Sequence, residues 1–119
     1  MNPKKSRPNQ LSGHTYQTNT GCGKLYITIN EHDGHPFELF ATMGKAGGCA
    51  CAQIEAIGRL VSLGLQRGIA SSHFIKQLSG ICCHSALIIG EDKTMSCADA
   101  IAKILKKHMD IKTELADKT

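Results

Sequence analysis

The amino-acid sequence predicts an α+β domain in which an antiparallel β-hairpin or small sheet packs on about three helices. Residues 25–30 (LYITIN) alternate apolar and polar side chains, as a strand with one buried face does. Residues 49–67 repeat apolar side chains at helical spacing over a length typical of a helix. Ser96 precedes Asp99 by three residues, a pattern that resembles the capping box of a helix N-terminus.

The β-hairpin is predicted from the strand at 25–30, a turn and a return strand at residues 37–43 (FELFATM). Asp33 and Gly34 are typical turn residues. Pro36 has no backbone N–H to donate to a neighbouring strand. We therefore expect a hairpin loop longer than two residues.

The long helix is followed by signals for its end and for shorter elements. Gly68 is expected to terminate it in a C-terminal cap. Two glycines inside the helix, Gly58 and Gly64, indicate close packing against another element, because glycine costs about 1 kcal/mol relative to alanine there. Its apolar stripe consists of Ile54, Ile57, Leu60, Val61 and Leu65.

Beyond this helix, Ser71 or Ser72 can cap a short helix that ends at Gly80. Residues 86–89 (ALII) are either a short strand or a buried loop. The final helix, which begins after Ser96, is expected to bury Ile101, Ile104 and Leu105.

The chain ends suggest less regular structure. Residues 1–20 are polar and contain Lys4, Lys5 and Arg7, so we expect a basic, extended N-terminal arm. Residues 111–119 are expected to form a C-terminal tail, which leaves 21–110 as the domain.

Composition limits the classes of function. Hydrophobic residues make up 41% of 119 residues, enough for one folded domain, and aromatic residues only 4%. The net charge of +4 favours anionic partners but falls short of a dedicated nucleic-acid binder. We see no export signal and no apolar run of membrane-spanning length, and therefore expect a cytoplasmic protein with reduced thiols.

Cysteines lie in segments where the backbone is expected to turn. Thiols gathered from several turns could bind one zinc ion, which prefers tetrahedral thiolate or imidazole ligands. The paired CxxC spacing of a zinc knuckle is absent, and cysteine is also frequently a small buried residue. Spacing alone therefore leaves metal binding and burial open for Cys22, Cys49, Cys51, Cys82, Cys83 and Cys97.

A glycine-rich segment, GKAGGC, opens the long helix. Free N–H groups at a helix N-terminus and its dipole suit a phosphate or carboxylate. The candidate anion contacts are Lys45, Gly47 and Gly48, with Arg59 and Lys24 as further cations. The segment matches neither a P-loop nor a dinucleotide-binding fingerprint, so a tight turn is the alternative.

Groupings typical of catalysis are sparse. Glu55 would pair with Arg59 four residues later, which is more often a structural contact than a catalytic one. A cysteine nucleophile, with His84 or His73 as its base, is the enzyme alternative, and Cys49 and Cys97 are its candidates because they lie near helix starts.

Taken together, several segments resemble the TSCPD domain, which forms the C-terminal part of many cobalamin-dependent ribonucleotide reductases and also occurs as small free-standing proteins. The resemblance covers roughly residues 7–107. The matching segments are RPNQLSGHTYQTNTGCGKLYITIN, GHPFELFATMGKAGGC, QIEAIGRLVSLGLQRG, IKQLSGICC and SCADAI.

The resemblance implies a four-thiolate zinc site of Cys22, Cys49, Cys83 and Cys97, with Cys51 and Cys82 outside it. The chain departs from the motif that names the family, because Met95 and Ala98 replace threonine and proline. Cys82 and His84 replace an arginine and a proline expected beside Cys83.

The large catalytic barrel of the reductases is absent, so the resemblance implies a chain that is not an enzyme. We expect a non-catalytic module that binds a nucleotide or another phosphate ligand. It would act either with a ribonucleotide reductase or as a free oligomer that sequesters signalling nucleotides, as some phage counter-defence proteins do. The alternative is a zinc-stapled protein-interaction domain without a small-molecule ligand. The small and apolar surface of the long helix also predicts a homo-oligomer built on it.

Overall fold

A computed structural model describes residues 3, 5–44, 48–83, 86–89 and 92–117. Within these residues the chain forms a three-stranded antiparallel sheet, a separate two-stranded hairpin and three helices. The predicted α+β class is therefore confirmed. In chain order the elements are β1 (Ser12–Thr20), β2 (Gly23–His32), β3 (His35–Met43), α1 (Gly48–Gln66), α2 (Ser71–Leu78), β4 (Leu87–Ile89), β5 (Asp92–Thr94) and α3 (Cys97–Asp117).

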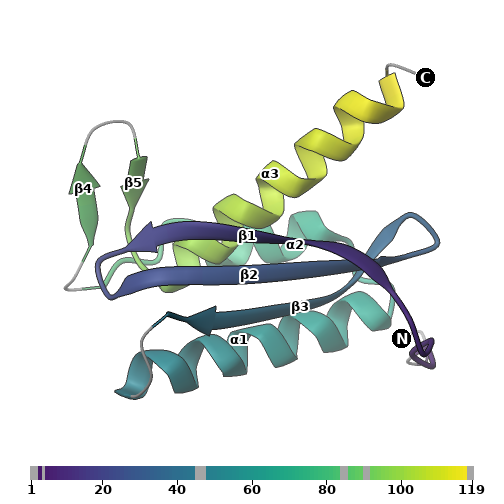
Figure 1. The fold of residues 1–119 in the computed structure, drawn as a ribbon, viewed down its shortest axis with the longest axis horizontal. Coiled ribbons are helices and arrows are strands. Elements are labelled where there is room, and N and C mark those ends of the chain that lie inside the picture. Colours follow the sequence, from purple (N-terminus) through teal and green to yellow (C-terminus); the bar gives the residue numbers. More distant parts are fainter. Residues whose placement is uncertain (1–2, 4, 45–47, 84–85, 90–91, 118–119) are drawn as a thin grey trace.

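The larger sheet has the order β1-β2-β3, and α1 runs alongside β3 while α2 packs on α3 (Figure 1). Its core-facing side chains alternate along β2, as the sequence predicts. The buried core joins the sheet to α1 and α3 and includes Leu25, Ile27, Ile29, Leu39, Ile54, Val61, Leu65, Ile101, Ile104 and Leu105.

The loop between β2 and β3 is shorter than expected. Asp33 and Gly34 alone connect the strands, with φ angles of 54° and 78° that match a type I′ turn. Pro36 is accommodated because it pairs opposite Glu31, where a bulge shifts the register. The prediction of a loop longer than two residues was therefore wrong.

The segment expected to be an arm is partly a strand. Residues 12–20 form β1 and pair with β2 along their whole length. This strand escapes a search for apolar alternation because it lies at the edge of the sheet and exposes most of its side chains. Backbone hydrogen bonds define it, helped by a 2.8 Å bond between the Thr15 and Thr28 hydroxyls.

The C-terminal segment also differs from the expectation. Helix α3 continues to Asp117, so residues 111–117 are helical and not a tail. This half of α3 extends beyond the sheet (Figure 1). An ion pair between Lys112 and Glu31 ties it back to β2.

Of the two helix caps predicted between α1 and α2, the one that ends α1 is confirmed and the one that begins α2 is wrong. Gly68 has a φ of 88°, and the Ile69 N–H donates to the Gly64 carbonyl at 3.0 Å, as in a Schellman motif. Helix α2 has Ala70 as its N-cap without a side-chain hydrogen bond, so the predicted serine cap is wrong. Ser71 is instead the first helical residue and is buried.

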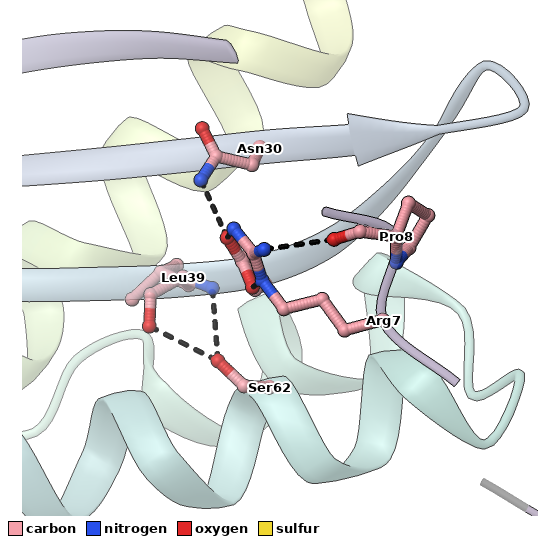
Figure 2. A network of polar contacts seen from close by, with 6 residues as sticks. Arg7, Pro8, Asn30, Leu39 and Ser62 are labelled. Atoms are coloured by element: carbon pink, nitrogen blue, oxygen red, sulfur yellow. Dashed lines mark hydrogen bonds and ion pairs between the residues drawn. The ribbon is translucent and has the colours of Figure 1, made fainter. Parts of the chain in front are cut away.

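Both glycines inside α1 lie at close contacts, as predicted. A Cβ atom on Gly58 would lie 3.1 Å from the Leu39 carbonyl oxygen, and one on Gly64 would lie 2.3 Å from Phe74 Cζ. This close approach lets the Ser62 side chain form hydrogen bonds with the backbone of β3, on the edge that has no neighbouring strand among the described residues (Figure 2). Its hydroxyl accepts from the Leu39 N–H at 2.9 Å and donates to the Leu39 carbonyl at 3.1 Å.

A buried carboxylate attaches the N-terminal segment to the sheet. Glu38 is 2% exposed and accepts two hydrogen bonds from Arg7, at 2.8 and 3.0 Å, and one from Asn30 Nδ2 at 2.6 Å (Figure 2). The Lys5 N–H donates to the Gln66 carbonyl at the end of α1. Arg7 is therefore engaged with the fold and is not part of a free arm.

Candidate functional site

The turn between β1 and β2 is organised by Thr20. Its buried hydroxyl accepts from the Cys22 N–H at 3.1 Å and donates to the Gly23 carbonyl at 2.9 Å. The Cys97 thiol at the start of α3 donates to the same hydroxyl at 3.7 Å. Thr20 thus brings two of the predicted metal ligands, Cys22 and Cys97, to one place.

Asp99 organises the loops on both sides of the β4–β5 hairpin. Its carboxylate accepts from the Gly80 N–H at 2.9 Å and from the Met95 N–H at 3.0 Å, and it pairs with Lys103 at 3.2 Å. Burial alone would raise the pKa of Asp99, but these hydrogen bonds and the ammonium charge hold it below the usual 3.8. The predicted capping box is half present. Ser96 Oγ accepts from the Asp99 N–H at 3.1 Å, whereas the Asp99 carboxylate binds the Met95 N–H.

The same loop positions Cys83, whose N–H donates to the Met95 carbonyl at 2.9 Å. Cys83 and Cys97 both lie near Cys22. Burial raises the pKa of the Cys22 thiol, and the neighbouring Cys97 and Cys83 thiols raise it further. Cys22, Cys83 and Cys97 are therefore close enough to interact electrostatically, although they come from segments that are far apart in the sequence.

The remaining cysteines behave differently. Cys49 belongs to the first turn of α1, and its side chain lies outside the described residues. The β1–β2 turn and the starts of α1 and α3 nevertheless all lie at the same end of the long axis of the molecule (Figure 1). Cys51 is half-buried, but Cys82 is exposed, so the burial alternative is wrong for Cys82. Among the described side chains, no three His, Cys, Asp or Glu residues form a group that could hold a metal ion as they stand.

The structure describes only some of the residues that were predicted to contact an anion. Lys45 and Gly47 lie outside the described residues, and Gly48 is the first residue of α1. Lys24 is exposed, and its carbonyl accepts from the Gly44 N–H at 2.8 Å, immediately before the glycine-rich segment. Arg59 lies about 16 Å further along the helix axis than Gly48, at 1.5 Å per residue.

Arg59 instead lines a groove of about 570 Å³ between α1 and β3. It is exposed and pairs with Glu55 at 3.6 Å, as predicted from their spacing. The groove wall also contains Glu38 and the exposed ring of Phe40. This mixture of charges does not favour a simple anion over other ligands.

A buried polar cluster between β1, β2 and α3 was missed in the sequence. His108 is 1% exposed, its Nδ1 lies 2.6 Å from the Tyr16 hydroxyl, and its Nε2 faces Glu31 Oε2 at 3.5 Å. The Tyr16 contact is a hydrogen bond whose donor depends on the imidazole tautomer, whereas His108 Nε2 and Glu31 Oε2 face each other without a hydrogen bond. Burial lowers the pKa of His108, and the charge of Glu31 offsets this only in part. The only sequence signal was that His108 lies on the buried stripe of α3, three and four residues after Leu105 and Ile104.

Comparison with known proteins gives the same family as the motifs. The model of the TSCPD domain matches residues 1–109. The chain belongs to the TSCPD domain family. In this TSCPD chain, the match begins before β1 and ends within α3, so it covers both sheets, α1, α2 and the first part of α3.

Curated relatives are long enzymes that contain a short region like this TSCPD chain. The vitamin B12-dependent ribonucleotide reductase of Agrobacterium fabrum is 31% identical over 70 residues, which is 58% of this chain and 6% of the enzyme. The vitamin B12-dependent ribonucleotide reductase of Bradyrhizobium diazoefficiens is 30% identical over 76 residues, or 63% of this chain and 6% of the enzyme. The chain thus spans about 6% of the length of the relatives it matches.

No solved structure matches the chain. A membrane-crossing helix would have to be both long and apolar, and none within the described residues meets that requirement.

Proposed function

We propose that this TSCPD chain is a non-catalytic, cytoplasmic accessory module of ribonucleotide reduction, stapled by zinc and built to bind a protein partner. The relationship to vitamin B12-dependent ribonucleotide reductases supports the link to that enzyme. The observation that supports the zinc staple is the contact of both Cys22 and Cys97 with the Thr20 hydroxyl, together with the electrostatic effect of Cys83 on Cys22. Cys49 is proposed as the fourth ligand, which would join α1 to the other segments.

The electrostatics of the three thiols fit a cation site. Burial makes the Cys22 thiol harder to ionise, and the nearby Cys97 and Cys83 add to this effect. A bound divalent cation reverses the effect, because it stabilises the thiolate forms. Zinc would supply tetrahedral coordination, and the chain's own Thr20 and Asp99 hold two of the thiol-bearing segments in place.

We expect the purified full chain to contain about one equivalent of zinc. Removal of zinc by a chelator should lower the melting temperature by roughly 10 °C or more, because the energy of metal binding is then lost from folding. Metal content is measured by mass spectrometry and the melting temperature by circular dichroism. Cys97→Ser should lose the metal.

Cys82→Ser is the matched control, since Cys82 is exposed and adjacent to Cys83 but lies outside the proposed set. This variant should keep its zinc. Less than about a tenth of an equivalent of zinc in the wild-type chain, or full zinc in Cys97→Ser, would contradict the staple.

Nucleotide binding is the second candidate, with two uses: regulation of a reductase or sequestration of signalling nucleotides. The placement of Lys24 beside Gly44 supports it, because the Gly44 N–H donates to the Lys24 carbonyl and Gly44 directly precedes the candidate residues Lys45, Gly47 and Gly48 in the chain. Helix α1 also has no acidic residue in its first turn to oppose an anion.

Calorimetric titration with deoxynucleoside triphosphates, cyclic oligonucleotides and ADP-ribose derivatives tests this candidate. We expect at least one of them to bind, and Lys24→Ala to raise its dissociation constant about tenfold, as loss of a charge-assisted contact does. Lys106→Ala, which removes an exposed lysine on α3, should leave binding unchanged. The absence of heat from every ligand would remove this candidate without affecting the zinc staple.

A further inference from the structure

Helix α1 is apolar on the face that points away from the core. Ala52, Ala56, Leu60 and Leu63 are all exposed and follow each other at helical spacing on this face. Leu60 and Leu63 are 67% and 43% exposed. A helix at the surface of a monomer normally carries polar residues on its solvent-facing side. An apolar solvent-facing side therefore indicates a binding surface for another molecule.

We propose that a second copy of this chain packs antiparallel on this outward face of α1, about a two-fold axis near residues 57 and 58. The face has small residues in its N-terminal half and large residues in its C-terminal half. A two-fold axis superposes the large half of one helix on the small half of the other. Leu60 then lies over the partner's Ala56, and Leu63 over the partner's Ala52, with both pairs centred within about 1 Å of one axis.

The charges beside this face obey the same symmetry. Glu55 and Arg59 are exposed on one flank of the apolar face. In an antiparallel helix pair, the same flank of both helices meets itself. Their midpoint is residue 57, so the axis that matches the alanines to the leucines also places Glu55 close to the partner's Arg59. An interface with a different protein would require neither this size matching nor this charge matching, and the observations therefore favour a second copy.

The groove on this flank extends the same surface. Phe40 on β3 is 52% exposed and lines the groove together with Leu63. Its ring adds apolar area beside the paired helices, on the side where the ion pairs lie. The proposed interface is therefore an apolar centre with a charged rim, as in stable homodimers.

Sedimentation velocity on the full chain, over a range of concentrations up to about 100 µM, tests the proposal, since weak specific dimers still form in this range. We expect a dimer. Leu60→Lys should raise the dimer dissociation constant at least about a hundredfold, because it places a charge at the centre of the interface. Ile111→Lys is the control, since Ile111 is an exposed apolar residue on α3, and it should leave the dimer intact.

Charge exchange gives a second, independent measurement. Glu55→Arg and Arg59→Glu should each weaken the dimer, because each brings like charges together across the two-fold axis. The double variant should restore it. A wild-type chain that stays monomeric throughout, a dimer that persists in Leu60→Lys, or a double variant no stronger than either single one would overturn the proposal.

Discussion

Replacing Asp99 by alanine is expected to lower the free energy of unfolding by about 3 kcal/mol, because it leaves two backbone donors without their charged acceptor. Gly80 and Met95 donate these N–H groups from opposite sides of the β4–β5 hairpin. The substitution also removes a negative charge from the first turn of α3, where the helix dipole favours it. Chemical denaturation of the variant and the wild type measures the difference.

Two further variants make this prediction specific. Asp99→Asn keeps one acceptor oxygen and should give an intermediate loss. Asp110→Ala removes an exposed carboxylate from the same helix and should change stability by less than about 0.5 kcal/mol. Because Asp99 holds the Cys83 segment, alkylation of Cys83 in zinc-free protein should also be faster in Asp99→Ala. A loss below about 1 kcal/mol would show that the carboxylate does not organise these loops.

The free energy of unfolding should fall steadily as the pH is lowered below about 6.5, because several buried or half-buried groups bind protons more weakly in the folded chain. Burial lowers the pKa of His108 from the usual 6.5. Hydrogen bonds from Arg7 lower the pKa of Glu38 from 4.5, against the opposing effect of burial. Burial would raise the pKa of Glu31, but Lys112 and His108 outweigh it, so this pKa too lies below 4.5.

The sign is the same for all three groups. A depressed pKa means that the unfolded chain takes up protons first, so each contribution is complete above the unfolded pKa and is lost as the pH falls through the folded one. We therefore expect constant stability between about pH 7 and 8, a decline that begins near 6.5 through His108, and a steeper decline below about 4.5 through the carboxylates.

Chemical denaturation at a series of pH values measures this profile. His108→Gln should flatten the decline between pH 7 and 5, whatever its effect on stability at pH 7. His73→Gln is the matched control, since His73 is exposed on α2, and it should retain the wild-type slope. Stability that rises on acidification to pH 5 would contradict the assignment of a neutral, buried His108.

Local sequence patterns were sufficient to predict the central helices and strands. The alternation along residues 25–30 identifies β2 because adjacent side chains of a strand point to opposite faces. The stripe of α1 and the Ser96 signal of α3 are likewise relations between residues a few positions apart. Gly68 could be assigned as a cap because few other residues adopt its φ of 88° without strain.

The candidate site could be predicted only in part, and for an identifiable reason. The family resemblance suggested the four cysteines, but only the tertiary structure brings Cys22 close enough to Cys83 and Cys97 for them to raise its pKa. Position along the helix also separates Arg59 from the glycine-rich segment with which it was grouped. The positions of the cysteines and of Arg59 depend on how helices and strands are arranged in space, which cannot be read from a local sequence pattern.

The sequence alone determined the fold class, the central strands, the helix cores and the family, since these follow from periodicity, capping and motifs that neighbouring residues express together. The tertiary structure decided that residues 12–20 complete the sheet, that Asp99 holds two distant loops and that His108 is buried beside Tyr16 and Glu31. An edge strand, a buried carboxylate and a buried imidazole are all stabilised by partners far away in the chain. Their identity therefore becomes visible only when the chain has folded.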